Sequence, residues 1–492
     1  MANHLVASSL KRTSYHVFLY SLGNILLKLV GLFLLPLYTS VFDIKEYGMI
    51  GILETVSLLL TTIISFNLSS ALVRWLSDEN DTTKEKSIVF TIFTLNTIFF
   101  TIFLILIFPF LKNISQILLK SELYTNIILL MFVNIYLDII TRIPLNLIRI
   151  REKSFLYIIS MILKSFFTLG VNIVLLKFTS FGILAVILGS IVGNIAFLVC
   201  TSHLFIKNLH CCFLKSEVFS LLKYSFPLIF VSLGTVLLNM GDRFVLEYLK
   251  GFGQVGIYTL AFKVSSAVNI FVLQAVNLAV LPIALKSFKT ENGRELLKQI
   301  FVYLAVLLCS MFLLISLFSL DVLKVFAKSN DFLLANRIIP ILLFAYVFEG
   351  LKIIYSYHIL YVKKTHWIAW LTLGSAFLNI ILNFIIIPKY GYMGAAITTL
   401  LSALITFIGY RIVALKLIYV NYTNKKVWYM IITALVLFVT HKIFERHDLA
   451  NIYYSSFILF LFLIFTHLFK IINFKLLFGK ILKRSPFRKP YL

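Results

Sequence analysis

Cysteine and histidine are scarce in this chain. Its 4 cysteines, Cys200, Cys211, Cys212 and Cys309, fall in predicted helices or in a predicted cytoplasmic loop, which excludes a disulfide framework. The 9 histidines are scattered, so we expect no metal site. A cleavable signal segment is not apparent, because the first apolar run is long enough to span a membrane and lacks an A-x-A exit.

Catalytic motifs are missing too. The sequence contains no Asp-x-Asp pair, no glycine-rich phosphate loop followed by Lys-Ser or Lys-Thr, and no Ser/His/Asp set at a recognisable spacing. The predicted outer connections are short, the longest near 319–335, so none could fold as the large outer loop of a membrane glycosyl polymerase. We expect a protein that is not an enzyme and has no cofactor. Without a nucleotide site, uphill transport would have to draw on an H⁺ or Na⁺ gradient.

Long apolar runs dominate what is present. Hydrophobic residues make up 60% of the 492 residues and charged residues 13%, and the mean hydropathy is +0.98. Runs of about 20 apolar residues, enough for a helix to cross a bilayer, recur from end to end. The sequence therefore predicts an all-α integral membrane protein with about fourteen transmembrane helices. We place them at 16–38, 48–67, 88–110, 124–144, 155–177, 180–202, 219–241, 257–283, 299–318, 336–362, 368–388, 392–415, 426–444 and 452–470.

The same membrane unit occurs twice. Residues 172–185 (NIVLLKFTSFGILA) recur as 383–396 (NFIIIPKYGYMGAA), and residues 47–58 (YGMIGILETVSL) have a looser counterpart at 255–267. Both pairs are offset by roughly 210 positions, which indicates an internal duplication. Two similar halves favour a transporter, because they can rock around a site held between them.

The duplication also predicts the domain organisation. We expect an N-terminal lobe of helices 1–6 at 1–210 and a C-terminal lobe of helices 7–12 at 211–420. Helices 13 and 14 and a basic cytoplasmic tail follow at 421–492.

Positive charge is in large excess. The net charge of +25 comes from 45 Lys and Arg against 20 Asp and Glu. Nucleic acid could explain such an excess, but the basic residues concentrate in alternate connections between the predicted helices. With a cytoplasmic N-terminus this pattern obeys the positive-inside rule, so we expect both termini in the cytoplasm. The tail would then lie against anionic lipid headgroups. Its basic residues are Lys480, Lys483, Arg484, Arg488 and Lys489.

A few charges fall inside or at the end of predicted helices. A charge at the bilayer centre costs at least about 2.5–3.5 kcal/mol on insertion scales, so these residues are candidates for function. Lys28 lies about 15 Å from either end of its helix at 1.5 Å per residue, too far for its side chain to reach the interface. The other candidates are Glu54, Asp138, Lys164, Arg243, Lys263, Glu349 and Lys352.

Local spacing gives some of these charges a structural interpretation. Asp138 and Arg142, at i,i+4, are spaced as an ordinary helical ion pair. Glu349 and Lys352, at i,i+3, can likewise neutralise each other.

The remaining charges need longer-range partners. Glu54 can pair with Lys28 across helices 1 and 2. Arg243, beside Asp242, is either functional or a headgroup anchor or paired residue. Lys164 and Lys263 lack a local partner, which favours a role facing a ligand.

Lysines that line a membrane cavity imply an anionic ligand. Phosphate or pyrophosphate fits best, because an ammonium is a strongly hydrated point charge suited to phosphoryl oxygens. A cavity carboxylate can carry the coupling ion, since it can take up H⁺ or Na⁺ on one side and release it on the other. The expected cationic substrate site is Lys28, Lys164, Arg243, Lys263 and Lys352. The ion-coupling candidates are Glu54, Asp138 and Glu349.

Three segments together resemble a known family. Residues 242–264 (DRFVLEYLKGFGQVGIYTLAFKV) are similar to the helix 7–8 junction of polysaccharide or O-antigen (Wzx-type) flippases. These form a branch of the multidrug/oligosaccharidyl-lipid/polysaccharide (MOP) exporter superfamily. The turn in 383–396 and the early run 36–48 (PLYTSVFDIKEYG) also resemble this branch. The resemblance covers the first twelve helices, whereas helices 13 and 14 match only in number and hydropathy.

The resemblance implies a fold and a function. The fold would be MATE-like, with two lobes of about six helices in a parallel repeat around a pseudo-two-fold axis along the membrane normal. The function would be to move polyprenyl-pyrophosphate-linked oligosaccharide repeat units of O-antigen, capsule or a similar polysaccharide. Movement would run from the inner to the outer leaflet of the bacterial cytoplasmic (inner) membrane by alternating access. Expected partners are that lipid-linked oligosaccharide, membrane lipids, and the polymerase and chain-length proteins of the same pathway.

Three other functions remain open at this point. A lipid II flippase of the same superfamily would differ in its sugar. A cation-coupled multidrug exporter would share the fold, although the lysines in the predicted helices favour an anionic ligand. A membrane polysaccharide polymerase is disfavoured by the short outer connections.

Overall fold

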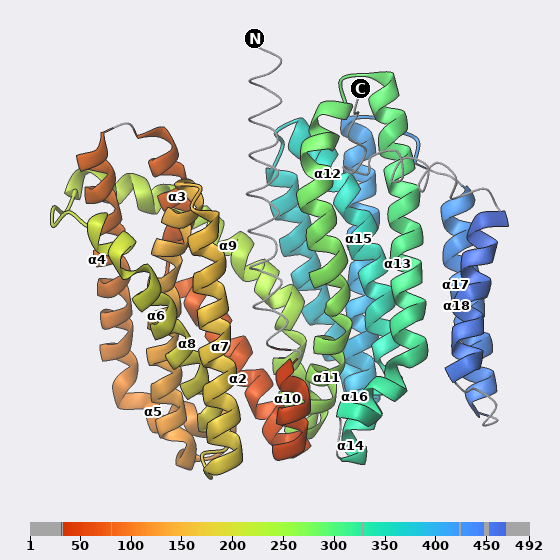
Figure 1. Cartoon of the computed structure of the whole chain (residues 1–492), viewed down its shortest axis with the longest axis horizontal. Helices are drawn as coiled ribbons and strands as arrows, with labels where there is room; N and C mark the ends of the chain where they lie inside the picture. Colours follow the sequence, from red (N-terminus) through yellow and green to blue (C-terminus); the bar gives the residue numbers. More distant parts are fainter. Residues whose placement is uncertain are drawn as a thin grey trace, which may run out of the picture. The chain divides into compact units, whose positions relative to one another are not determined.

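Helices form all the regular structure that is described. The computed structural model describes residues 31, 33–79, 81–326, 329–422, 425–446 and 452–468. Every regular element in these ranges is helical (Figure 1). Among the described residues, 11 helical segments are long and apolar enough to cross a membrane. The all-α membrane fold predicted from composition is therefore confirmed.

The chain divides into two compact units, each built from segments distant in sequence. The first comprises Met1–Val264, Leu323–Ile338 and Ala369–Ser402, and the second comprises Ser265–Val322, Ile339–Ile368 and Ala403–Leu492. The lobe boundaries expected near residues 210 and 420 stay a prediction.

The first unit holds most of the amino-terminal helices. Its elements are α2 (Ile44–Ile64), α3 (Leu68–Asp78), α4 (Thr82–Ile107), η1 (Phe108–Phe110), α5 (Leu111–Leu119), η2 (Glu122–Tyr124), α6 (Thr125–Ile150), α7 (Ser154–Phe178), α8 (Ile183–Lys207), α9 (Lys215–Met240), α10 (Asp242–Lys250), α11 (Phe252–Ser265), α14 (Asn330–Leu333), η4 (Leu334–Arg337) and the middle of α16 (His366–Leu417).

The second unit contains the remaining elements. These are η3 (Asn269–Leu273), α12 (Gln274–Ser287), most of α13 (Glu291–Phe326), α15 (Ile339–Tyr361), both ends of α16, α17 (Lys425–Arg446) and α18 (Ile452–Leu468). The outer connection expected near 319–335 is largely helical, because α13 continues to Phe326 and α14 and η4 follow.

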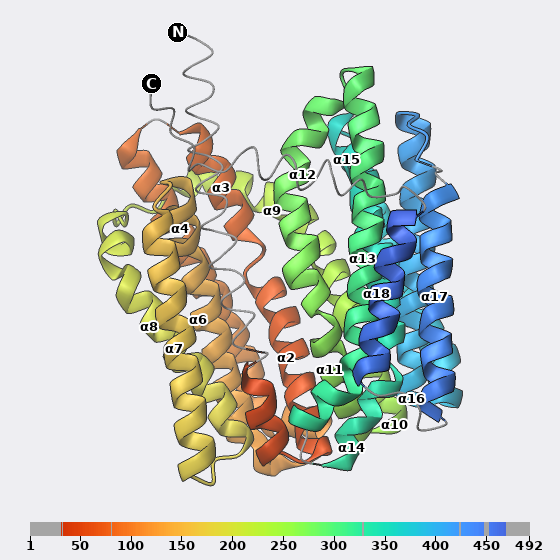
Figure 2. The ribbon, with the colours of Figure 1, turned by 45° about the vertical axis from the view of Figure 1, so that its right-hand side comes forward.

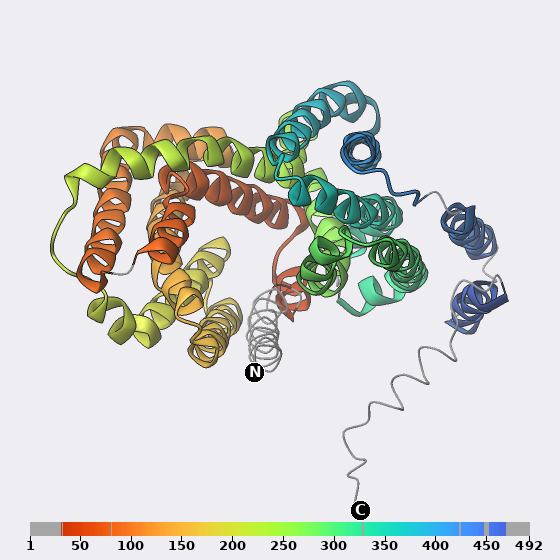
Figure 3. The same cartoon turned by 90° about the horizontal axis from the view of Figure 1, so that it is seen from above.

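Local signals explain where several helices begin and how closely they pack. Asp43 caps α2 by accepting a 2.7 Å hydrogen bond from the Glu46 N–H, and the Glu46 side chain accepts one from the Asp43 N–H. Gly189 and Gly193 of α8 face α7 so closely that a Cβ at either would overlap an α7 side chain. The neighbouring helices α6, α7 and α8 thus form a tight group, which Figure 3 shows from above.

The predicted repeat reappears as a shared backbone turn. Gly182, between α7 and α8, has φ 54° and ψ −131°, and Gly391, within α16, has φ 56° and ψ −135°. These values lie in a region that is accessible essentially only to glycine. The kink at Gly391 divides the 52-residue α16 into helices 366–390 and 392–417. They match the two separate spans predicted there.

A reciprocal crossing joins the second pair of repeated segments. A Cβ on Gly48 of α2 would collide with the backbone of Phe252, and a Cβ on Gly256 of α11 would collide with the backbone of Ile44. In the repeat alignment Gly48 corresponds to Gly256, so each helix contributes the same glycine contact to the other. A mutual contact of this kind is what a pseudo-two-fold relation produces.

The two carboxy-terminal helices lie side by side (Figure 2). His441 of α17 contacts Ser455 of α18 through a 2.9 Å hydrogen bond and stacks on Tyr454. Their bounds agree with the spans predicted at 426–444 and 452–470. The first predicted span, 16–38, lies mostly outside the described residues, as do Lys28 and the basic tail. The count of about fourteen spans therefore stays a prediction.

Candidate functional site

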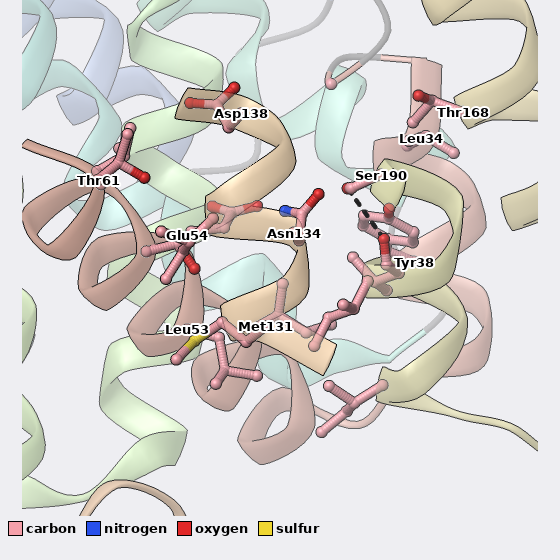
Figure 4. A pocket seen from close by; sticks show the side chains of 18 of the residues that line it. Leu34, Tyr38, Leu53, Glu54, Thr61, Met131, Asn134, Asp138, Thr168 and Ser190 are labelled. Carbon is pink, nitrogen blue, oxygen red and sulfur yellow. Dashed lines mark hydrogen bonds between the residues drawn. The ribbon is translucent and has the colours of Figure 1, made fainter. Parts of the chain in front are cut away.

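A cavity of about 390 Å³, lined by both apolar and polar side chains, lies within the first unit. Helical residues 33–41, α2, α6, α7 and α8 bound it, and single residues of α9 and α11 complete its wall. Glu54, Asn134 and Asp138 are among the residues that line it and are labelled in Figure 4. The polar lining residues are Tyr38, Glu54, Ser57, Thr61, Asn134, Asp138, Thr168, Ser190 and Lys263.

An ion pair joins α2 to α11 at the wall of this cavity. The Lys263 ammonium donates a 2.8 Å hydrogen bond to Glu54, and their side chains are 21% and 37% exposed. The same ammonium lies 5.4 Å from the ring centroid of buried Tyr47, a cation–π contact. Glu54 is not a local partner of Lys263, because a helix distant in sequence supplies it.

A second ion pair lies within α6. Arg142 donates a 3.1 Å hydrogen bond to Asp138, as the i,i+4 spacing predicts. Asp138 lines the cavity, whereas half-buried Lys164 of α7 does not line it but interacts electrostatically with Asp138. Asp138 thus presents a carboxylate to the cavity with an arginine already bound to it.

The ion pair predicted within the span 336–362 also forms. Lys352 donates a hydrogen bond to Glu349 within α15, and its ammonium lies 5.5 Å from the ring centroid of Tyr410. Both belong to the second unit and neither lines the cavity. The structure therefore shows the two side chains neutralising each other, rather than lining the cavity.

Arg243 is buried, with 1% exposure, which rules out a headgroup anchor at the protein surface. Its Nε donates a 3.2 Å hydrogen bond to Thr259, and its guanidinium lies 4.9 Å from the ring centroid of Phe262. Its Nη1 has no hydrogen-bond partner in the described part of the chain. The residue adds positive potential close to Lys263.

Asp242, which the sequence interpretation treated only as a neighbour of Arg243, is fully buried. Its carboxylate accepts hydrogen bonds from Tyr258 at 2.5 Å, Asn383 at 2.6 Å and Thr399 at 2.8 Å. Asn383 also accepts a hydrogen bond from Thr398. A buried carboxylate needs such donors, a proton or a cation, and this group of oxygen atoms is chemically suited to a small hard cation.

The repeated asparagine was a sequence signal that a polar partner such as Asp242 lies nearby. Asn172 and Asn383 are the first residues of the repeated segment, and both side chains have 0% exposure. A buried amide in a membrane helix requires polar partners. The sequence could not say that Asp242 is the partner of Asn383, because the two lie on helices far apart along the chain.

Comparison with known proteins agrees with this arrangement. A sequence model described as "Polysaccharide biosynthesis protein" matches residues 15–288, more than half of the chain. The chain belongs to the polysaccharide biosynthesis protein family. A second family model, MatE, matches residues 227–385.

This member of the polysaccharide biosynthesis protein family resembles one membrane protein in sequence and another in fold. It is 23% identical over 487 residues to an uncharacterized membrane protein of Methanocaldococcus jannaschii, covering 92% of each chain. The lipid II flippase MurJ in an inward closed conformation aligns with a TM-score of 0.72 and 17% identity, over 92% of this chain and 98% of that one.

A transporter of another type has the same fold. An inward-facing multidrug resistance MATE family transporter of the MOP superfamily aligns with a TM-score of 0.63 and 13% identity, over 82% of this chain and 95% of that one. The expected resemblance is thereby confirmed at the level of family and fold, since the chain belongs to the polysaccharide biosynthesis protein family and shares the fold of these solved transporters. Every residue that lines the cavity, together with Asp242 and Arg243, lies within the segment matched by the polysaccharide biosynthesis model.

Proposed function

We propose that this protein is a flippase for polyprenyl-pyrophosphate-linked oligosaccharide repeat units of O-antigen, capsule or a similar polysaccharide. It would act in the bacterial cytoplasmic membrane, with both termini in the cytoplasm. The observation that carries the proposal is the cavity with Lys263 and several hydroxyl and amide side chains in its wall, inside the segment that matches the polysaccharide biosynthesis family. An ammonium suits the phosphoryl oxygens of the head group, and the hydroxyl and amide side chains suit its sugar.

The lipid tail would stay in the bilayer while the head group enters the cavity. The lobes expected at 1–210 and 211–420 would then rock between inward-open and outward-open states. Lys263 and, if it faces the same cavity, Lys28 would attract the pyrophosphate. The protein would pass its substrate to the polymerase and chain-length proteins of the pathway.

An H⁺ or Na⁺ gradient would drive the cycle. Among the residues expected to carry the ion, Glu54 and Asp138 line the cavity. Asp242 is a further candidate, because its carboxylate is fully buried among hydroxyl and amide groups that could share a cation or a proton. These roles deepen the proposal, which requires no catalytic step.

A leaflet-accessibility assay tests the function. The full chain is reconstituted in liposomes that carry polyprenyl-pyrophosphate oligosaccharide on one face, with an imposed proton or sodium gradient and an impermeant glycosidase outside. We expect protein-dependent cleavage that Lys263→Ala abolishes. Lys442→Ala is the matched control, since Lys442 forms a 2.5 Å pair with Glu445 inside α17, outside the cavity. Equal cleavage with and without protein would contradict the proposal.

A cation-coupled multidrug exporter is the second candidate. It is favoured by the two carboxylates, Glu54 and Asp138, that line the same cavity. The same liposomes loaded with a cationic dye distinguish the two functions. Gradient-driven dye efflux without exposure of the lipid-linked sugar would assign the chain to drug export, whereas exposure of lipid II instead would identify a lipid II flippase.

A further inference from the structure

The Glu54–Lys263 pair is built so that an anionic ligand can replace one of its partners. We propose that the Glu54 carboxylate is bound to the Lys263 ammonium until a phosphoryl oxygen of the substrate displaces it. This inference rests on the proposed function and makes one ammonium the partner first of the carboxylate and then of the substrate.

Both partners are accessible from the cavity. Glu54 and Lys263 line it, and the Glu54 side chain retains 37% exposure although its carboxylate is bound. The Lys263 ammonium carries three N–H donors, and a phosphate group offers several charged oxygens. A ligand in the cavity can therefore approach the ammonium from the side on which Glu54 already lies.

Lys263 is held in place independently of Glu54. The buried ring of Tyr47 lies 5.4 Å from its ammonium, so the cation retains a contact when the carboxylate leaves. Arg243, buried on the neighbouring helix α10, adds positive potential to the same region. Glu54 has more freedom to move, because it is the more exposed partner.

The pair connects the two repeats. Glu54 and Lys263 are separated by 209 residues, close to the repeat offset, and so occupy nearly corresponding positions on α2 and α11. Both follow the reciprocal crossing at Gly48 and Gly256 by about two helical turns. Any separation of α2 from α11 during transport would stretch this ion pair. A ligand that takes over Lys263 therefore lowers the free energy needed to separate the two helices.

Binding of inorganic pyrophosphate to the purified full chain, measured by titration calorimetry, tests the exchange. Glu54→Gln removes the competing carboxylate and should tighten binding about tenfold, which corresponds to about 1.4 kcal/mol. Lys263→Gln should weaken binding by at least about tenfold, and Lys263→Arg should retain it. The matched control Glu445→Gln, in the local pair of α17, should leave the affinity unchanged. Elution as a single species by size exclusion checks that each variant is folded.

Glu54→Gln binding pyrophosphate no more tightly than wild type would overturn the exchange. Absence of pyrophosphate binding to every variant would overturn it as well.

Failure of the exchange and failure of the proposed function give different results. Sugar exposure in liposomes that Lys263→Ala abolishes, with no gain in Glu54→Gln affinity, would leave the flippase standing without the exchange. Tighter pyrophosphate binding by Glu54→Gln, with no sugar exposure by the wild type, would leave an anion-exchange site in a protein of another function.

Discussion

Each repeat has a buried asparagine shortly before a turn at a glycine with positive φ, yet the two asparagines have different polar partners. Asn172 accepts a 3.0 Å hydrogen bond from Tyr38 and donates one of 2.7 Å to the Thr168 carbonyl. Asn383 donates to the Asp242 carboxylate at 2.6 Å. Both asparagines have 0% exposure. One half thus holds a neutral polar contact where the other holds a buried acid.

The difference shows that two repeated segments with similar backbone turns can hold different polar contacts. The backbone geometry of the turns is retained in both halves, since Gly182 and Gly391 differ by only a few degrees in φ and ψ. The hydrogen-bond partners of the two asparagines differ instead. Glu54 and Lys263 show the same divergence, because nearly corresponding positions carry opposite charges and bind each other.

The largest expected effect comes from neutralising the buried acid of the second half. Asp242→Asn should reduce the stimulation of transport by a proton or sodium gradient about 5–150-fold, the range of typical coupling free energies, because an amide cannot exchange an ion. Leaflet accessibility in liposomes, with and without a gradient, measures it. An unchanged gradient response at equal protein content would show that the acid is structural.

The two asparagines should differ in their contribution to stability. Asn172→Ala leaves a neutral phenol without its acceptor, at about 1–3 kcal/mol, and Asn383→Ala removes a donor from a carboxylate, which costs more. We expect thermal unfolding in detergent to show a lower midpoint for Asn383→Ala than for Asn172→Ala. Equal midpoints would mean that the buried acid needs no more support than the neutral contact.

The smallest expected difference lies at the glycine turns. Gly182→Ala adds only backbone strain, about 1–3 kcal/mol, since nothing lies within 4 Å of the new Cβ. Gly391→Ala adds the same strain and also displaces Gln254, whose Oε1 accepts a 2.9 Å hydrogen bond from the Tyr392 N–H. Thermal unfolding should therefore rank Gly391→Ala as the less stable variant. The reverse order would show that the two turns are strained for different reasons.

Ion pairs were predicted correctly from the sequence where both partners lie three or four residues apart on one helix. The spacing of Asp138 and Arg142, and of Glu349 and Lys352, predicted pairs that the structure contains. The partner of Lys263 could not be predicted in this way, since α2 and α11 meet only through a crossing between the two repeats. The burial of Arg243 and Asp242 could not be predicted, because they follow a helix end at Gly241, where the sequence suggests a surface.

The sequence by itself determined that this is a helical membrane protein with a duplicated unit and a polysaccharide biosynthesis family signature. These properties depend on the length of apolar runs, on repeated segments and on local spacing. All three can be read directly from the order of the residues. Only the tertiary structure decided that Glu54 binds Lys263, that Asp242 binds Asn383, and that Lys352 lies outside the cavity. The physical reason is that a charge in a membrane helix is stabilised by whichever distant helix packs against it.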